Sequence, residues 1–116
     1  MLEVVFYRDK RGAEPVRDYI DNLPRRADRA TVLRYVVLLA DQGHTLLAKG
    51  HARMIDRTSR IYELRPGAYR VAYAEHAGGF VLLHARRKQG QKLDSQALDL
   101  ARGRLNEWRE RHGSDP

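Results

Sequence analysis

A run of basic residues at the end of an apolar segment is the part of this sequence most suited to chemistry. Residues 84–92, His-Ala-Arg-Arg-Lys-Gln-Gly-Gln-Lys, hold four formal positive charges and no acid. The run continues the apolar segment 80–85 and leads into a predicted helix, so we expect its backbone to be fixed at both ends. Arginine forks match phosphate oxygens and histidine titrates near neutral pH, so the run predicts a site for a phosphate-bearing ligand. A merely solvated loop is the alternative.

Two arginines flank a predicted tight turn earlier in the chain. Arg65 precedes Pro66-Gly67, and Arg70 follows it. With a two-residue turn, Arg65 pairs with Ala68. Glu63 then pairs with Arg70, and both arginines lie on one face of the hairpin as diagonal neighbours. A cross-strand salt bridge between Arg70 and Glu63 explains the same pattern without a site.

The sequence carries no motif for a metal site, a phosphate-binding loop or a serine or cysteine nucleophile. His44 and His51 lie seven residues apart, without a third ligand at metal-binding spacing. Gly78-Gly79 lies between predicted strands and not between a strand and a helix, so it does not form a phosphate loop. No serine lies in a nucleophile elbow, and the absence of cysteine removes thiolate chemistry. We therefore expect neither a metal nor a cofactor.

A cationic site without a metal has the groups that RNA cleavage needs. The ribose 2′-hydroxyl attacks the adjacent phosphate when a base takes its proton, and cations stabilise the charge that develops. Arg65, Arg70 and His84 supply such groups, although a lone histidine on an apolar strand is also explained as a hydrogen-bonded core residue. Tyr69 and Tyr73 are predicted to stack unpaired bases, with the interior of the sheet as the alternative place for both rings.

The face on which His84 lies depends on the turn at Gly78-Gly79. A loop with an even number of residues places His84 on the side of the two tyrosines, away from the arginines. A loop with an odd number, or a β-bulge, brings His84 to the arginine side. The sequence leaves both arrangements open.

Length and composition predict one small domain. The chain has 116 residues, of which 42% are hydrophobic, and this suits a single core. We assign residues 1–113 to the domain and residues 114–116 to a tail. A net charge of +7 attracts polyanions such as nucleic acid, an acidic protein or an anionic membrane.

The pattern of charges and apolar runs favours a cytoplasmic protein. Charges at Glu3, Arg8 and Asp9 do not fit a signal peptide. The longest apolar run, residues 35–40, is too short to cross a bilayer, so we expect no membrane association. A chain without cysteine fits a reducing compartment.

Periodicity predicts an α+β domain in the order β-α-α-β-β-β-α, with helices packed on a mostly antiparallel sheet. Residues 43–59 are predicted to be irregular. In the second helix, an apolar stripe of Leu33, Val36, Val37 and Ala40, widened by Val32, Tyr35 and Leu39, is predicted to pack against the sheet. The predicted strands cover residues 2–7, 61–65, 68–75 and 80–85, and the predicted helices run from Pro15 to Asn22, from after Pro24 to Gln42, and onward from a cap at Asp94 or Ser95.

Three segments in the second half of the chain carry a recognisable pattern. They are 61–65 (Ile-Tyr-Glu-Leu-Arg), 68–73 (Ala-Tyr-Arg-Val-Ala-Tyr) and 81–84 (Val-Leu-Leu-His), followed by lysines and an alanine-bearing helix. This pattern resembles the RelE/ParE toxin superfamily, most closely its HigB-like, phage-related branch, and implies a RelE-like fold. The resemblance covers about residues 60–108. The chain departs from the branch pattern at four positions, where Ala85 replaces glycine, Arg86 phenylalanine, Gln89 lysine and Asp94 proline.

The resemblance implies a toxin of a type II toxin–antitoxin pair. Toxins of the RelE and HigB types cut mRNA in the ribosomal A site without a metal, whereas ParE-type toxins poison DNA gyrase. By position, Arg65 and Lys88 correspond to phosphate-binding residues that stabilise the transition state, and His84 is the candidate acid or base. The further residues predicted to bind RNA are Arg70, Arg86, Arg87, Lys92, Tyr69 and Tyr73.

Three functions follow as hypotheses. The first is a ribosome-dependent mRNA endonuclease that works by attack of the 2′-hydroxyl, and the second is a ParE-type gyrase inhibitor that binds without catalysis. The third is an inactive module that binds nucleic acid or protein, which the departures at Arg86 and Gln89 keep open. The implied partners are an antitoxin, often of helix-turn-helix type, the ribosome with its mRNA, and operator DNA bound by the toxin–antitoxin complex.

Overall fold

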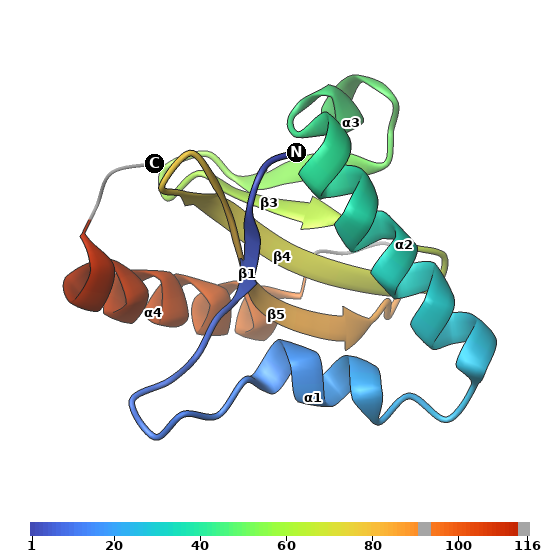
Figure 1. Ribbon diagram of the computed structural model, residues 1–116, viewed down its shortest axis with the longest axis horizontal. Coiled ribbons are helices and arrows are strands. Elements are labelled where there is room, and N and C mark those ends of the chain that lie inside the picture. The colour runs from blue at the N-terminus through green and yellow to red at the C-terminus, as the bar shows by residue number, and fades with distance from the viewer. Residues whose placement is uncertain (91–93, 114–116) are drawn as a thin grey trace.

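The computed structural model describes residues 1–90 and 94–113 as an α+β domain with one five-stranded sheet (Figure 1). The predicted fold class is confirmed, and the candidate residue Lys92 lies outside the described residues. In chain order the elements are β1 (Val4–Phe6), α1 (Pro15–Asp21), α2 (Arg26–Gln42), α3 (Thr45–Ala48), β2 (Ala52–Asp56), β3 (Ile61–Leu64), β4 (Tyr69–His76), β5 (Gly79–Arg87) and α4 (Ser95–His112).

The sheet is covered on both faces. Its strand order is β1-β5-β4-β3-β2, with β1 parallel to β5 and the other neighbours antiparallel. One face, including Tyr73 and Leu82, packs against α1 and α2, and the other, including Val81 and Leu83, packs against α4. β5 is apolar on both sides because it lies between these two cores. No helix within the described residues is both long and apolar enough to span a membrane.

A bulge in β5 decides where His84 lies. The β4–β5 turn is the two-residue loop Ala77-Gly78, one residue before the predicted position, and both residues have positive φ, 51° and 80°. This even loop would place His84 with the tyrosines. The pairing shifts, however, from Tyr73↔Leu82 to Ala72↔His84. The extra residue on β5 turns His84 to the α4 side of the sheet, which is the side of Arg70.

The β3–β4 turn lies one residue later in the chain than the sequence predicts. Leu64 pairs with Val71 and Glu63 with Ala72, so the predicted pairing of Glu63 with Arg70 is wrong. Pro66 has no N–H to contribute to a ladder, and its carbonyl instead accepts from Tyr69 N at 3.0 Å, which closes a four-residue turn.

The segment predicted to be irregular contains α3 and the edge strand β2. A four-residue helix is too short to show a period, and the exposure of Arg53 and Met54 on β2 breaks the apolar pattern of a strand. The predicted stripe on α2 is also partly wrong. Leu33 and Val37 are 45% and 53% exposed, whereas Val32, Leu39 and Ala40 are buried.

Two glycine-to-alanine substitutions test the packing of β1 on β5. A Cβ at Gly79 would lie 2.0 Å from the carbonyl oxygen of Glu3, so we expect Gly79→Ala to cost about 2–4 kcal/mol of unfolding free energy. Gly103 of α4 has no atom within 4 Å of the same position, and there alanine should stabilise by about 0.5–1 kcal/mol. Urea denaturation measures both, and an unchanged midpoint for Gly79→Ala would contradict the close approach.

Candidate functional site

A buried glutamate of β3 lies at the centre of a group of arginines on the α4 side of the sheet. The side chain of Glu63 is 2% exposed, and Arg86 Nη2 lies 3.2 Å from its Oε2. Arg53 Nη2 and Arg70 Nε lie 3.5 Å and 4.0 Å from its Oε1. We call these four residues the Glu63 cluster. Its arginines come from β2, β4 and β5, so one carboxylate joins side chains from all four antiparallel strands.

The sheet register builds the Glu63 cluster. Arg53 and Glu63 are direct partners across β2 and β3, and Arg70 and Arg86 are direct partners across β4 and β5. The partner of Glu63 on β4 is Ala72, two residues from Arg70. Because side chains alternate along a strand, all four side chains project from the same face.

The Glu63 cluster has a surplus of positive charge. Three arginines oppose one carboxylate, which leaves +2. The pKa of Arg70 is lowered, first by burial and then by the nearby charge of Arg65. Within the described part of the chain, Oε1 of Glu63 receives no hydrogen bond, so only charge attraction holds the arginines on that side. The surplus favours an anionic ligand.

Exposed cations border the Glu63 cluster. The backbone N–H of Arg65 donates to His51 O at 3.0 Å, and that of Lys88 donates to Ala68 O at 2.7 Å, which extends the β4–β5 pairing. Arg65 and Lys88 are exposed, and the side chain of Arg53 is 43% exposed. We call Arg53, Arg65 and Lys88 the rim cations, because a ligand from solvent meets them before the buried arginines.

Arg70 supports the turn that carries a rim cation. It is 6% exposed, and its Nη1 donates to Gly67 O at 2.9 Å and to Tyr69 O at 2.6 Å. These two hydrogen bonds hold the backbone of the β3–β4 turn in place, next to Arg65. Little of Arg70 is open to a ligand, so its place in the structure is that of a positioning residue and not of a direct RNA contact.

His84 lies beside the Glu63 cluster as a neutral imidazole. Its pKa is lowered, mainly by burial and then by the charges of Arg104 and Arg86. Arg104 Nη1 donates to Leu83 O at 2.8 Å and lies 3.4 Å from His84 Nδ1. A guanidinium can only donate, so Nδ1 is the accepting nitrogen and the proton of the ring sits on Nε2. Arg104 thereby sets the tautomer.

The first turn of α4 covers the buried part of the site. The side chain of Asp94 accepts from the backbone N–H groups of Gln96 and Ala97 and caps the helix. A cavity of about 10 Å³ remains between this turn and the sheet, lined by Glu63 and His84 among others. This is room for about one water molecule. A phosphate is too large for this cavity, so it can bind only at the exposed rim cations.

The remaining candidates do not join this face. Tyr69 and Tyr73 lie in the core on the α1 and α2 side, 6% and 0% exposed, so neither ring presents a face on which a base could stack. Burial raises the pKa of the Tyr73 hydroxyl above its usual value, in keeping with its place in the core. Arg87 points to that same side, 5.8 Å from the centroid of the Tyr69 ring. Of the candidate arginines and lysines within the described residues, Arg70 and Arg86 line the cavity beside His84, and Arg65 and Lys88 follow the ends of β3 and β5.

Two residues of the site are not among those that the sequence predicts. Arg53 lies in the segment predicted to be irregular, although the alternation from Ala52 to Ile55 is a weak strand signal. Arg104 is one of several charges on a helix, and no sequence pattern links it to His84 across 20 residues.

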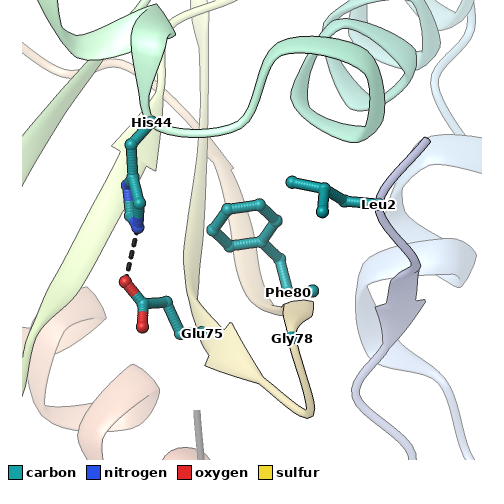
Figure 2. A pocket seen from close by; sticks show the side chains of 6 residues that line it. Leu2, His44, Glu75, Gly78 and Phe80 are labelled. Carbon is teal, nitrogen blue, oxygen red and sulfur yellow. Dashed lines mark hydrogen bonds and ion pairs between the residues drawn. The ribbon is translucent and has the colours of Figure 1, made fainter.

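A separate cavity of about 300 Å³ lies beside the β4–β5 turn (Figure 2). There His44 Nε2 is 2.5 Å from Glu75 Oε1, and the imidazole packs against Tyr62 and Phe80 with ring centroids 4.9 Å and 5.3 Å away. None of the candidate residues from the sequence lines this cavity. Across residues 1–90 and 94–113, no three His, Asp or Glu side chains form a group able to hold a metal ion.

A comparison with models of protein families finds a match that covers most of the chain. The family described as "Phage derived protein Gp49-like (DUF891)" matches residues 18–106, which contain the Glu63 cluster and all the rim cations. The chain belongs to this family. The Gp49-like family is known as one of RelE-like type II toxins. A comparison with curated proteins finds no match.

Removal of the Glu63 charge tests the centre of this Gp49-like site. Glu63→Gln leaves the buried Arg70, the largely buried Arg86 and the exposed Arg53 without their common counter-ion, so we expect a loss of about 3–5 kcal/mol of unfolding free energy. Glu14→Gln is the matched control, because the Glu14–Arg17 pair is exposed and should change stability by less than about 1 kcal/mol. Urea denaturation compares the two, and equal losses would show that Glu63 is not the anchor.

The tautomer of His84 gives a second prediction. Its folded pKa is below 6.5, so the unfolded chain binds the proton more tightly, and His84 lowers stability as pH falls below about 6.5. In ¹⁵N NMR we expect a midpoint below 6.5 and the Nε2–H form at pH 7. Arg104→Gln should raise the midpoint. A midpoint above 6.5 in the native protein would contradict the assignment.

Proposed function

We propose that this Gp49-like chain is the toxin of a type II toxin–antitoxin pair, of the HigB-like branch, and that it cleaves mRNA on the ribosome. The observation that carries the proposal is the group of rim cations, Arg53, Arg65 and Lys88, held above a buried carboxylate on the sheet of a RelE-like fold. Inhibition of gyrase without catalysis is the alternative, and the experiment below separates the two.

The rim cations bind the scissile phosphate of the message. Arg65 and Lys88 follow the ends of β3 and β5, the two strands that flank β4, and Arg53 reaches the same face from the edge strand. The Glu63 cluster beneath them fixes the strands, so the cations are in position before RNA arrives. Preorganised charge of this kind stabilises a transition state without reorganisation at the moment of reaction.

Cleavage proceeds within the RNA strand. The 2′-oxygen forms a bond to phosphorus while the bond from phosphorus to the 5′-oxygen breaks, which gives a 2′,3′-cyclic phosphate and a 5′-hydroxyl. The 2′-hydroxyl loses its proton to water, and the 5′-oxygen gains one from water. The phosphorane carries extra negative charge between these events, and the rim cations attract it more strongly than the ground-state phosphate.

His84 serves as a hydrogen-bond donor in this scheme. Its accepting nitrogen, Nδ1, faces Arg104, and its Nε2–H is left to donate toward a phosphate oxygen at the rim through the one water molecule for which the cavity has room. The ring is neutral at pH 7 because burial and the neighbouring arginines lower its pKa. Because Nδ1, its only accepting nitrogen, faces Arg104, His84 adds a neutral donor beside the charged ones and does not act as the base.

An antitoxin is the partner that covers this surface and keeps the toxin inactive. With a net charge of +7 and three exposed rim cations, the toxin attracts an acidic or amphipathic segment that covers the site. By the family resemblance the antitoxin is of helix-turn-helix type, and the complex binds operator DNA.

A translation reaction in vitro, followed by primer extension on the message, tests the proposal. The wild-type protein is expected to cut mRNA only when that mRNA is translated. Arg65→Gln and Lys88→Gln should each lower the cutting rate by about 10²–10³-fold, because each removes a cation that stabilises the transition state. His84→Gln keeps an N–H donor and should lose far less.

Lys10→Gln is the matched control, since it removes an exposed positive charge from the β1–α1 loop. It should cut at the wild-type rate. Full activity of Arg65→Gln and Lys88→Gln would contradict the site. Intact mRNA with wild-type protein would contradict the reaction, and a supercoiling assay with gyrase would then test the ParE-type alternative.

A further inference from the structure

A polar cavity on the other side of β5 continues the positive surface of the proposed site. It has a volume of about 260 Å³ and lies between the start of α2, the β3–β4 turn and the end of β5. Arg25, Asp28 and Thr31 line it from α2 and the residue before it, and Arg87 lines it from β5. On the same measure the 10 Å³ cavity beside His84 holds about one water molecule, so this cavity has room for a phosphate with part of its hydration shell.

Two arginines in this cavity are available to an anion. Among residues 1–90 and 94–113, no carboxylate lies within ion-pair distance of Arg25 or Arg87. Arg87 is held over the ring of Tyr69, which limits the conformations of its side chain. Asp28 is the one acid in the lining, and it accepts a hydrogen bond from Tyr69 Oη at 3.0 Å. The charged residues that line the cavity, Arg25, Arg87 and Asp28, therefore have a net charge of +1.

The strand β5 joins this cavity to the Glu63 cluster. Arg86 and Arg87 are consecutive, so their side chains leave opposite faces of the sheet. Arg86 turns to Glu63, and Arg87 turns to the cavity. Lys88 follows at the end of the strand, where its N–H bonds Ala68 of the β3–β4 turn. The end of β5 thus carries basic residues on both faces of the sheet, and the cavity on the Arg87 side reaches the start of α2, on the right of Figure 1.

We propose that the cavity between Arg25 and Arg87 is a second phosphate subsite, which binds the backbone of the same single-stranded RNA one or a few nucleotides away from the rim cations. The inference rests on the proposed function for the identity of the ligand as RNA. A single strand bends around the end of β5 easily, whereas a duplex is stiff. Both arginines bind the backbone, so the subsite adds affinity and register without base preference.

Binding of a short single-stranded RNA by fluorescence anisotropy, over a range of salt concentrations, tests this subsite. The RNA carries 2′-O-methyl groups, so it binds but is not cut. Replacing both cavity arginines, in Arg25→Gln/Arg87→Gln, should weaken binding about tenfold. It should also reduce the slope of log K against log salt by about 0.7 for each phosphate that an arginine no longer neutralises. The double variant Lys10→Gln/Arg11→Gln removes the same charge from the β1–α1 loop, at the lower left in Figure 1, and should bind within about twofold of the wild type.

Asp28→Asn gives a test in the opposite direction. The amide oxygen can still accept from Tyr69 Oη, but the negative charge is gone, so the subsite should bind RNA about threefold more tightly and with a steeper salt dependence. A variant that was merely misfolded would not gain affinity, which separates this outcome from a loss of structure.

Wild-type affinity and salt slope in both Arg25→Gln/Arg87→Gln and Asp28→Asn would overturn the subsite, as would effects equal to those of the loop control. Neither result bears on cleavage, which the translation assay with Arg65→Gln measures. If the message stays intact in that assay while the cavity variants change RNA binding as expected, the reaction is wrong and the subsite stands.

Discussion

The carboxylate of Glu63 is removed from water in the middle of the sheet, and the positions of the basic side chains depend on it. Burial of a charge costs several kcal/mol unless partners compensate it, and here three arginines do so from three different strands. Without the carboxylate these guanidinium groups would repel one another across the register of β2, β4 and β5. Glu63 thus holds the three arginines in fixed positions despite their mutual repulsion. The net positive charge that remains attracts a phosphate to the rim cations.

Two further constraints shape the site around the Glu63 cluster. The bulge in β5 shifts His84 from the tyrosine side to the side of Glu63, and the even Ala77-Gly78 turn alone would have placed it elsewhere. Arg104 of α4 then fixes the tautomer of His84 through its contact with Nδ1. Because α4 also closes the space above the buried residues, chemistry is confined to the exposed edge of the cluster. The fold separates positioning residues, which are buried, from ligand-binding residues, which are exposed.

The sequence predicts the fold class and most elements because their signals are local. The strand at 80–85 is apolar on both faces, and Gly43 ends α2 where expected, with φ of 56°. The site depends instead on register, which a single residue changes. The sequence places Arg70 opposite Glu63, but the real turn places Ala72 there. On the other side of β4, the pairing with β5 places Arg70 opposite Arg86. The bulge at His84 has no sequence signature, and Arg53 lies in an edge strand that alternates only weakly.

The chemistry of the RNA ends shows whether the cationic face promotes attack of the RNA on its own phosphate. Message recovered from a translation reaction with this protein can be digested to oligonucleotides around the cut and analysed by mass spectrometry. We expect a 2′,3′-cyclic phosphate on the upstream fragment and a 5′-hydroxyl on the downstream one. A 3′-hydroxyl with a 5′-phosphate would require an external nucleophile and would contradict this reaction.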